Sequence, residues 1–94
     1  MRKIEEEMLY AVARKEKWTK DNTRVCPSDD GNLVKVYLHD NHIATKIYSE
    51  GKFSTNLSTL RRYPTNTTMS RLRALGVDVC RKAGKTYING EIVE

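Results

Sequence analysis

The segment RRYPTNTTMSRLRALG, residues 61–76, contains the groups of this chain best suited to bind an anion. A helix is predicted to begin among the threonines that follow Pro64, and the unpaired backbone N–H groups of a helix start favour negative charge. Threonine and serine hydroxyls add donors there, and arginine guanidinium groups match the oxygens of phosphate or carboxylate in pairs. These residue types therefore suit a nucleic-acid backbone or an acidic patch on a protein.

The same helix also has an ordinary structural interpretation. Because a helix turns by about 100° per residue, Met69, Leu72 and Leu75 fall on one stripe, and Arg71 and Arg73 flank it on either side. Their aliphatic stems would then cover the edges of the core while the guanidinium groups reach water. At the level of sequence both interpretations stay open.

Positive charge is concentrated in this part of the chain. Of the net charge of +5, residues 1–60 supply little, with ten basic against nine acidic residues, whereas residues 61–85 hold seven basic residues against Asp78 alone. The last three of these cations flank a predicted turn at Ala83–Gly84, which is either a hairpin tip that touches phosphates or a solvated turn. The predicted contact surface, called the basic face below, consists of Arg61, Arg62, Tyr63, Thr67, Thr68, Arg71, Arg73, Arg81, Lys82 and Lys85.

Two histidines and two cysteines are the candidates for metal or redox chemistry. His39 and His42 bracket a predicted Asp40–Asn41 turn and would face each other across two strands, a spacing that suits two metal ligands. With no evident third or fourth ligand beyond the nearby Asp40, we favour solvent-facing histidines and predict no metal. Cys26 and Cys80 have no CxxC partner, so they are expected to be free thiols that act as small hydrophobic groups, with a disulfide or shared metal as the alternative.

The sequence holds no motif that predicts catalysis. There is no GxSxG, P-loop or HExxH pattern, and 94 residues with few large apolar groups are hard to shape into a deep pocket that excludes water. We therefore predict a binding protein without a cofactor rather than an enzyme.

The hydrophobic pattern predicts one small α+β domain over residues 1–94. Apolar residues at helical spacing predict an N-terminal helix, with Ile4, Met8 and Val12 on its buried side. Residues 19–31 are rich in turn formers, and only 23–26 suggest a brief extended piece. Alternation then predicts a three-stranded antiparallel meander over residues 33–57, with Ile43, Thr45 and Ile47 together on one side of its second strand. A second helix to about residue 75 and a short C-terminal β-hairpin complete the expected order, with residues 92–93 left as a further short strand or a tail.

No apolar run approaches the roughly 20 residues that a membrane span requires, and the beginning of the sequence lacks the apolar centre of a secretory signal. We therefore expect a cytosolic protein without a membrane partner, as a monomer or small homo-oligomer.

Two stretches of the chain resemble small accessory, non-virion proteins of short-tailed bacteriophages. These are VYLHDNHIATKIY, residues 36–48, and YPTNTTMSRLRALGVDVCRKAGKTYING, residues 63–90, which match an LHGN-x-IA hairpin and a TT-x-SRL-x-AL helix start. The likeness covers about half of the chain. Asp40 stands where such proteins commonly have glycine, and LRRYPT replaces a Gly-Trp-x-Thr lead-in, so the turn before the helix is expected to be built differently. The resemblance implies a non-structural phage protein made in the host cytoplasm, and it implies no catalytic residues.

Charge and resemblance together predict the function. We expect a phage accessory protein for host takeover that binds and modulates a host protein with an acidic surface through the basic face. The alternative is a small nucleic-acid-binding protein that uses the same residues on the phosphate backbone of DNA or RNA.

Overall fold

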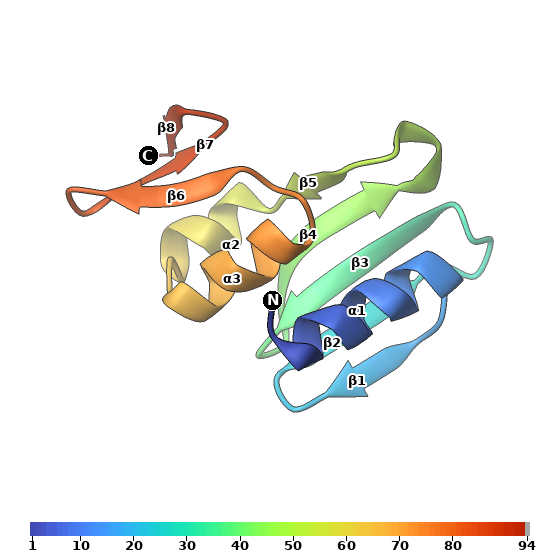
Figure 1. The fold of residues 1–94 in the computed structure, drawn as a ribbon. Coiled ribbons are helices and arrows are strands. Elements are labelled where there is room, and N and C mark those ends of the chain that lie inside the picture. The colour runs from blue at the N-terminus through green and yellow to red at the C-terminus, as the bar shows by residue number, and fades with distance from the viewer. Residues whose placement is uncertain (94) are drawn as a thin grey trace.

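The chain is α+β, as expected, and it forms two antiparallel sheets with three α-helices (Figure 1). The computed structural model describes residues 1–93. In chain order the elements are α1 (Lys3–Arg14), β1 (Trp18–Lys20), β2 (Thr23–Pro27), β3 (Leu33–Leu38), β4 (Asn41–Ile47), the 3-10 turn η1 (Tyr48–Glu50), β5 (Phe53–Thr55), α2 (Leu57–Arg62), α3 (Asn66–Ala74), β6 (Val79–Lys82), β7 (Lys85–Ile88) and β8 (Glu91–Val93). The larger sheet has the order β1-β2-β3-β4-β5 and the smaller one β6-β7-β8.

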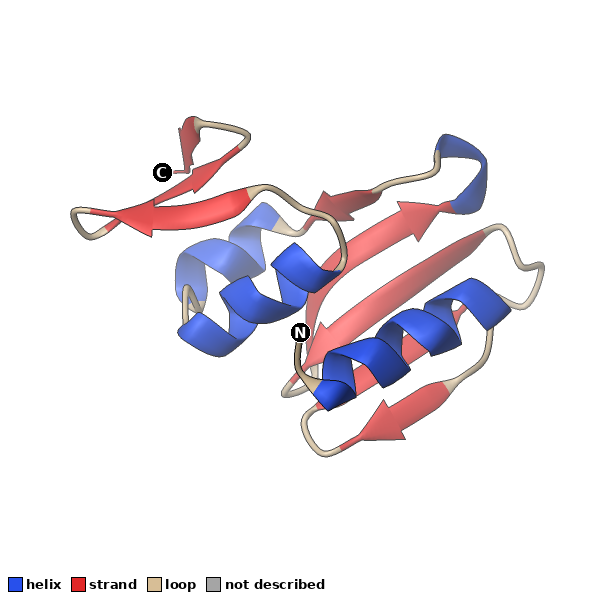
Figure 2. Cartoon of the chain, in the orientation of Figure 1, coloured by secondary structure: helices blue, strands red, loops and turns tan. Residues whose placement is uncertain are grey.

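The core lies between the larger sheet and the helices. In Figures 1 and 2, α1 and α3 lie on one face of this sheet, and α2 adds the buried Leu60 to the same core. Alternate residues of the sheet point into this layer because side chains of a strand alternate between its faces. The buried apolar residues are Met8, Ala11, Val12, Val25, Val34, Val36, Leu38, Ile43, Ala44, Leu60, Met69, Leu72, Leu75 and Val79.

The predicted meander is present as β3, β4 and β5, but it is part of a larger sheet. The prediction of mostly turns for residues 19–31 was wrong, because β1 and β2 lie within residues 18–27 and pair from Trp18↔Val25 to Lys20↔Thr23. These strands are short and bounded by turn formers, so the sequence pattern did not reveal them. The C-terminal hairpin is present as β6 and β7, and the segment left open as a strand or a tail forms a third strand, β8. The helix α2 was not predicted.

The β3–β4 turn lies one residue earlier than predicted. His39 and Asp40 have φ of 51° and 63°, so they form the two-residue turn, and Leu38 pairs with Asn41. A bulge then shifts the register after Tyr37↔His42, so that Ile43 and Ala44 are both buried. The predicted grouping of Ile43 with Ile47 was therefore wrong, since Ile47 is 42% exposed.

A buried ion pair joins α1 to α3. The Arg71 Nη1 donates to Glu5 Oε2 at 2.8 Å, and both side chains are at most 4% exposed. The Ser70 hydroxyl donates to the same oxygen at 2.5 Å, and the backbone N–H of Arg2 donates to Glu5 Oε1 at 3.3 Å. Arg71 Nε also donates to Thr23 Oγ1 at 3.0 Å, so both charges have hydrogen-bond partners.

This environment lowers the pKa of Glu5 below its ordinary value of 4.5. Burial by itself would raise that pKa, but the hydrogen bonds from Ser70, Arg71 and the Arg2 backbone, with the positive charge of Arg71, outweigh it. A carboxyl group with a depressed folded-state pKa stabilises the fold above its unfolded pKa, and this stabilisation is lost as the pH falls through the folded value.

Loss of the Arg71 guanidinium is expected to destabilise the fold strongly. Arg71→Met leaves the Glu5 carboxylate buried without its counter-charge, which costs about 3–5 kcal/mol of the free energy of unfolding. The double variant Glu5→Leu/Arg71→Met removes both charges and should recover most of that loss in urea unfolding at pH 7. A loss below about 1 kcal/mol in the single variant would show that the pair is dispensable.

Acid should remove the contribution of Glu5. The unfolding free energy of the wild type is expected to fall as the pH drops below 4.5, and the Glu5→Leu/Arg71→Met variant should lose less over the same range. The measurement is urea unfolding at steps between pH 6 and pH 3. Equal pH dependence of the two proteins would contradict a depressed pKa at Glu5.

Glycine at position 40 is expected to stabilise the chain. Asp40 adopts φ of 63°, which costs a residue with a Cβ more than it costs glycine. Asp40→Gly should raise the unfolding free energy by about 0.4–1 kcal/mol, less the small loss of an exposed contact with Arg24 at 3.6 Å. The converse control is Gly90→Ala at φ of 81°, where an added Cβ would meet no neighbour, so a loss of stability there reports the backbone alone. A destabilising Asp40→Gly would contradict this account of the turn.

Candidate functional site

The structure divides the predicted basic face into buried and exposed parts. Thr68 and Arg71 are only 2% and 3% exposed, so the expectation that they contact a partner was wrong. Arg71 forms an ion pair with Glu5, and the Thr68 hydroxyl lies 3.0 Å from the hydroxyl of Thr65. Thr65 also caps α3, because its Oγ1 accepts from the Thr68 backbone N–H at 3.1 Å. The Thr65 hydroxyl thus already occupies one of the free backbone N–H groups at the start of α3.

Arg73 is exposed but has a structural contact. Its Nε donates to the backbone oxygen of Val79 at 2.9 Å, which ties α3 to the beginning of β6. Thr67 is half-buried at the start of α3. Neither residue lines the groove described next.

Three cations of the basic face do come together. Arg61 at the end of α2, Arg81 on β6 and Lys85 on β7 line a hollow of about 370 Å³ between α2 and the smaller sheet. A neighbouring hollow of about 290 Å³ shares Arg61, Ile92 and Val93 with it. We call the two hollows together the α2 groove, and the full lining is Leu57, Leu60, Arg61, Pro64, Arg81, Gly84, Lys85, Thr86, Ile88, Asn89, Glu91, Ile92 and Val93.

Arg81 fixes one wall of the α2 groove. Its Nη1 donates to the backbone oxygen of Pro64 and its Nη2 to that of Gly84, each at 3.2 Å. These bonds join the α2–α3 connection to the tip of the β6–β7 hairpin. Because both acceptors are neutral carbonyls, the positive charge of Arg81 is not cancelled.

The groove cations have no carboxylate partner within residues 1–93. In that part of the chain the ion pairs are Arg14–Glu16, Lys20–Glu7, Arg24–Asp40 and Arg71–Glu5. Glu91 is the single acidic residue in the lining. The groove therefore presents a net positive charge to any ligand.

Apolar side chains accompany this charge. Leu57 and Ile92 line the α2 groove and are 41% and 42% exposed, and Tyr63, which precedes the lining residue Pro64 in the chain, is 41% exposed. The Arg62 guanidinium lies 5.7 Å from the centroid of the Tyr63 ring. Lys82 is exposed at the same hairpin tip as Lys85. The surface is thus basic with an apolar part, which sequence reasoning missed because Leu57 and Ile92 belong to elements far apart in the chain.

Asn56 positions the helix that carries Arg61. Its Oδ1 accepts from the Thr59 backbone N–H at 3.3 Å and caps α2, while its Nδ2 lies 3.1 Å from His42 Nδ1. His42 Nε2 is 3.0 Å from the Ala44 carbonyl oxygen, which can only accept, so Nε2 carries the proton and Nδ1 accepts from Asn56. The Asn cap was a usable sequence signal for α2.

The two histidines are not arranged as predicted. His39 lies in the turn, whereas His42 pairs with Tyr37, so they do not face each other across the strands. Both ring nitrogens of His42 already have partners. Cys26 and Cys80 are free and half-buried.

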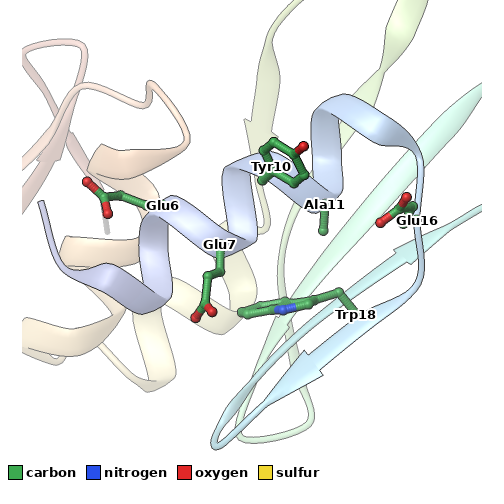
Figure 3. A pocket seen from close by; sticks show the side chains of 6 residues that line it. All are labelled: Glu6, Glu7, Tyr10, Ala11, Glu16 and Trp18. Atoms are coloured by element: carbon green, nitrogen blue, oxygen red, sulfur yellow. The ribbon is translucent and has the colours of Figure 1, made fainter.

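Another hollow lies between α1 and β1, far from the basic face in sequence. It has a volume of about 410 Å³, and Figure 3 shows Glu7 and Ala11 pointing toward Trp18 there. Two of its three carboxylates are engaged, Glu7 by Lys20 at 2.7 Å and Glu16 by Arg14 at 3.2 Å. This leaves little net charge to attract a cation.

No helix within residues 1–93 is both long and apolar enough to span a membrane.

Comparison with known proteins places the chain among bacteriophage proteins. A family model described as the Kyanoviridae Gp96 protein matches residues 1–93. No curated protein matches the chain, and no solved structure does so either. The match confirms the expected phage origin, while the short-tailed virion and the accessory role stay predictions. Because the match spans nearly the whole sequence, the chain belongs to the Kyanoviridae Gp96 family of phage proteins.

Proposed function

We propose that this protein is a non-enzymatic phage accessory protein that binds an acidic segment of a host protein in the α2 groove and thereby modulates that protein. It would act in the cytoplasm of the infected cell. The observation that carries this proposal is the convergence of Arg61, Arg81 and Lys85, from three separate elements, on one groove without carboxylate partners.

The mixture of charge and apolar surface favours a protein ligand. Exposed Leu57 and Ile92 offer a place for apolar side chains of a partner, and a few well-packed, desolvated side chains supply most of the affinity of protein interfaces. The neighbouring cations would steer an acidic partner and set the encounter rate. The ligand that fits is a segment in which carboxylates flank one or two apolar residues.

Nucleic acid remains the second candidate for the same surface. It is favoured by the pair of exposed lysines, Lys82 and Lys85, at the hairpin tip, together with Arg62 against the exposed Tyr63 ring. The burial of Thr68 and Arg71 takes two donors away from this alternative. The phosphate backbone of a nucleic acid is charged, so it would also gain nothing from the apolar lining of the α2 groove.

Charge reversal in the groove is expected to weaken binding of the host protein. The tagged protein and its Arg61→Glu/Lys85→Glu variant are incubated with nuclease-treated lysate of infected cells, and the affinity for the captured protein is then measured with purified components. The variant should bind at least about tenfold more weakly, because two steering and pairing charges become repulsive.

The matched control is Lys17→Glu/Lys52→Glu, which makes the same change in net charge at two exposed positions away from the groove. It should bind as the wild type does, and thermal unfolding checks that both variants fold. Equal binding by both double variants would refute the α2 groove as the contact. Capture that disappears with nuclease, with a log–log salt slope near −0.7 to −0.9 per phosphate, would instead support the nucleic-acid candidate.

A further inference from the structure

The larger sheet has one face without a covering layer. The helices α1 and α3 cover the opposite face (Figure 1). On the uncovered face Thr19, Lys35, Ile47 and Ser54 are exposed. Register pairs share a face, so the strand pairing defines this outer face. Its residues are Thr19, Arg24, Cys26, Leu33, Lys35, Tyr37, His42, Thr45, Ile47 and Ser54.

Three planar groups form a strip across the outer face. Arg24 on β2, Tyr37 on β3 and His42 on β4 stand in register. The Arg24 guanidinium carbon is 4.6 Å from the centroid of the Tyr37 ring, and the Tyr37 and His42 ring centroids are 5.5 Å apart. Hydrogen bonds to both ring nitrogens hold His42 in place, so the strip is set before any ligand arrives.

The charge of this face selects an anionic partner. Arg24 and Lys35 lie on it, and none of its ten residues is a carboxylate. Asp40, in the adjacent turn, is 3.6 Å from Arg24, but its side chain is 88% exposed and such pairs are weak. Arg24 Nε is buried and has no hydrogen-bond partner within residues 1–93. A second copy packed against this face would bring cations together, so self-association is disfavoured.

We propose that the outer face binds single-stranded nucleic acid. Unpaired bases would stack on the strip of Arg24, Tyr37 and His42, since rings and guanidinium planes are what such bases stack on. Lys35 lies two residues along β3 from Tyr37, about 7 Å away, within reach of the phosphate beside a stacked base. Leu33 and Ile47, one register step further, extend the platform with apolar surface.

This site is separate from the α2 groove. It uses β2, β3 and β4 and shares no residue with the groove lining. Stacking requires exposed base faces, which a duplex does not offer, so the outer face should prefer single strands. The two proposals can therefore fail independently.

The test is fluorescence anisotropy of a labelled 12-nucleotide oligo(dT) titrated with the full chain at 50 mM salt. The oligonucleotide should bind at least about tenfold more tightly than a duplex of equal length, with a salt slope near −0.7 per phosphate contact. Tyr37→Leu should weaken binding about tenfold through lost stacking, and Lys35→Glu should weaken it and make the slope shallower. Lys35 is exposed, so its variant reports binding even where Tyr37→Leu perturbs the sheet.

The groove variant Arg61→Glu/Lys85→Glu serves as the control and should keep most of its affinity for oligo(dT). The proposal would be overturned if the chain bound oligo(dT) no more tightly than it binds the duplex. It would also be overturned if oligo(dT) bound no more tightly than polyglutamate, which is a polyanion without bases. Wild-type affinity in Lys35→Glu, or loss of binding in the groove variant alone, would overturn it as well.

Discussion

The buried ion pair of Glu5 and Arg71 is the contact on which the arrangement of the C-terminal half depends. It joins the first turn of α1 to the middle of α3, and Thr23 on the same guanidinium adds the start of β2. A buried charge is tolerated only when paired and hydrogen-bonded, so this contact permits one placement of α3. The chain runs from α3 through Gly76 into β6, and the smaller sheet is one wall of the α2 groove. The candidate site thus rests on a contact outside it.

The basic side chains of residues 61–85 have different structural roles. Arg71 neutralises a carboxylate, Arg73 holds the backbone of Val79, and Arg81 bridges two loops through neutral carbonyls. Arg73 and Arg81 both keep their positive charge because their acceptors are neutral carbonyls, but of the two only Arg81 lies in the α2 groove beside Arg61 and Lys85. A cluster that looks uniform in sequence therefore supplies both structural ties and a cationic groove, and composition alone cannot assign the two roles.

Local patterns predicted much of the fold, and long-range contacts account for what was missed. The first helix, the strands β3 and β4 and the cap of α3 follow from periodicity and turn formers. The pairing of Glu5 with Arg71 spans 66 positions and leaves no local signal, so Arg71 looked solvent-facing. The bulge at Tyr37↔His42 broke the alternation after it, and β1 was too short to show a period. The α2 groove itself forms only when α2 and the smaller sheet meet.

Hydrogen–deuterium exchange on the complex with the captured host protein, after nuclease treatment, tests the α2 groove most directly. The account predicts that amides of residues 57–64 and 80–93 exchange more slowly in the complex, while those of β2 and β3 do not change. Protection confined to other parts of the chain, with residues 57–64 and 80–93 exchanging as in the free protein, would contradict it.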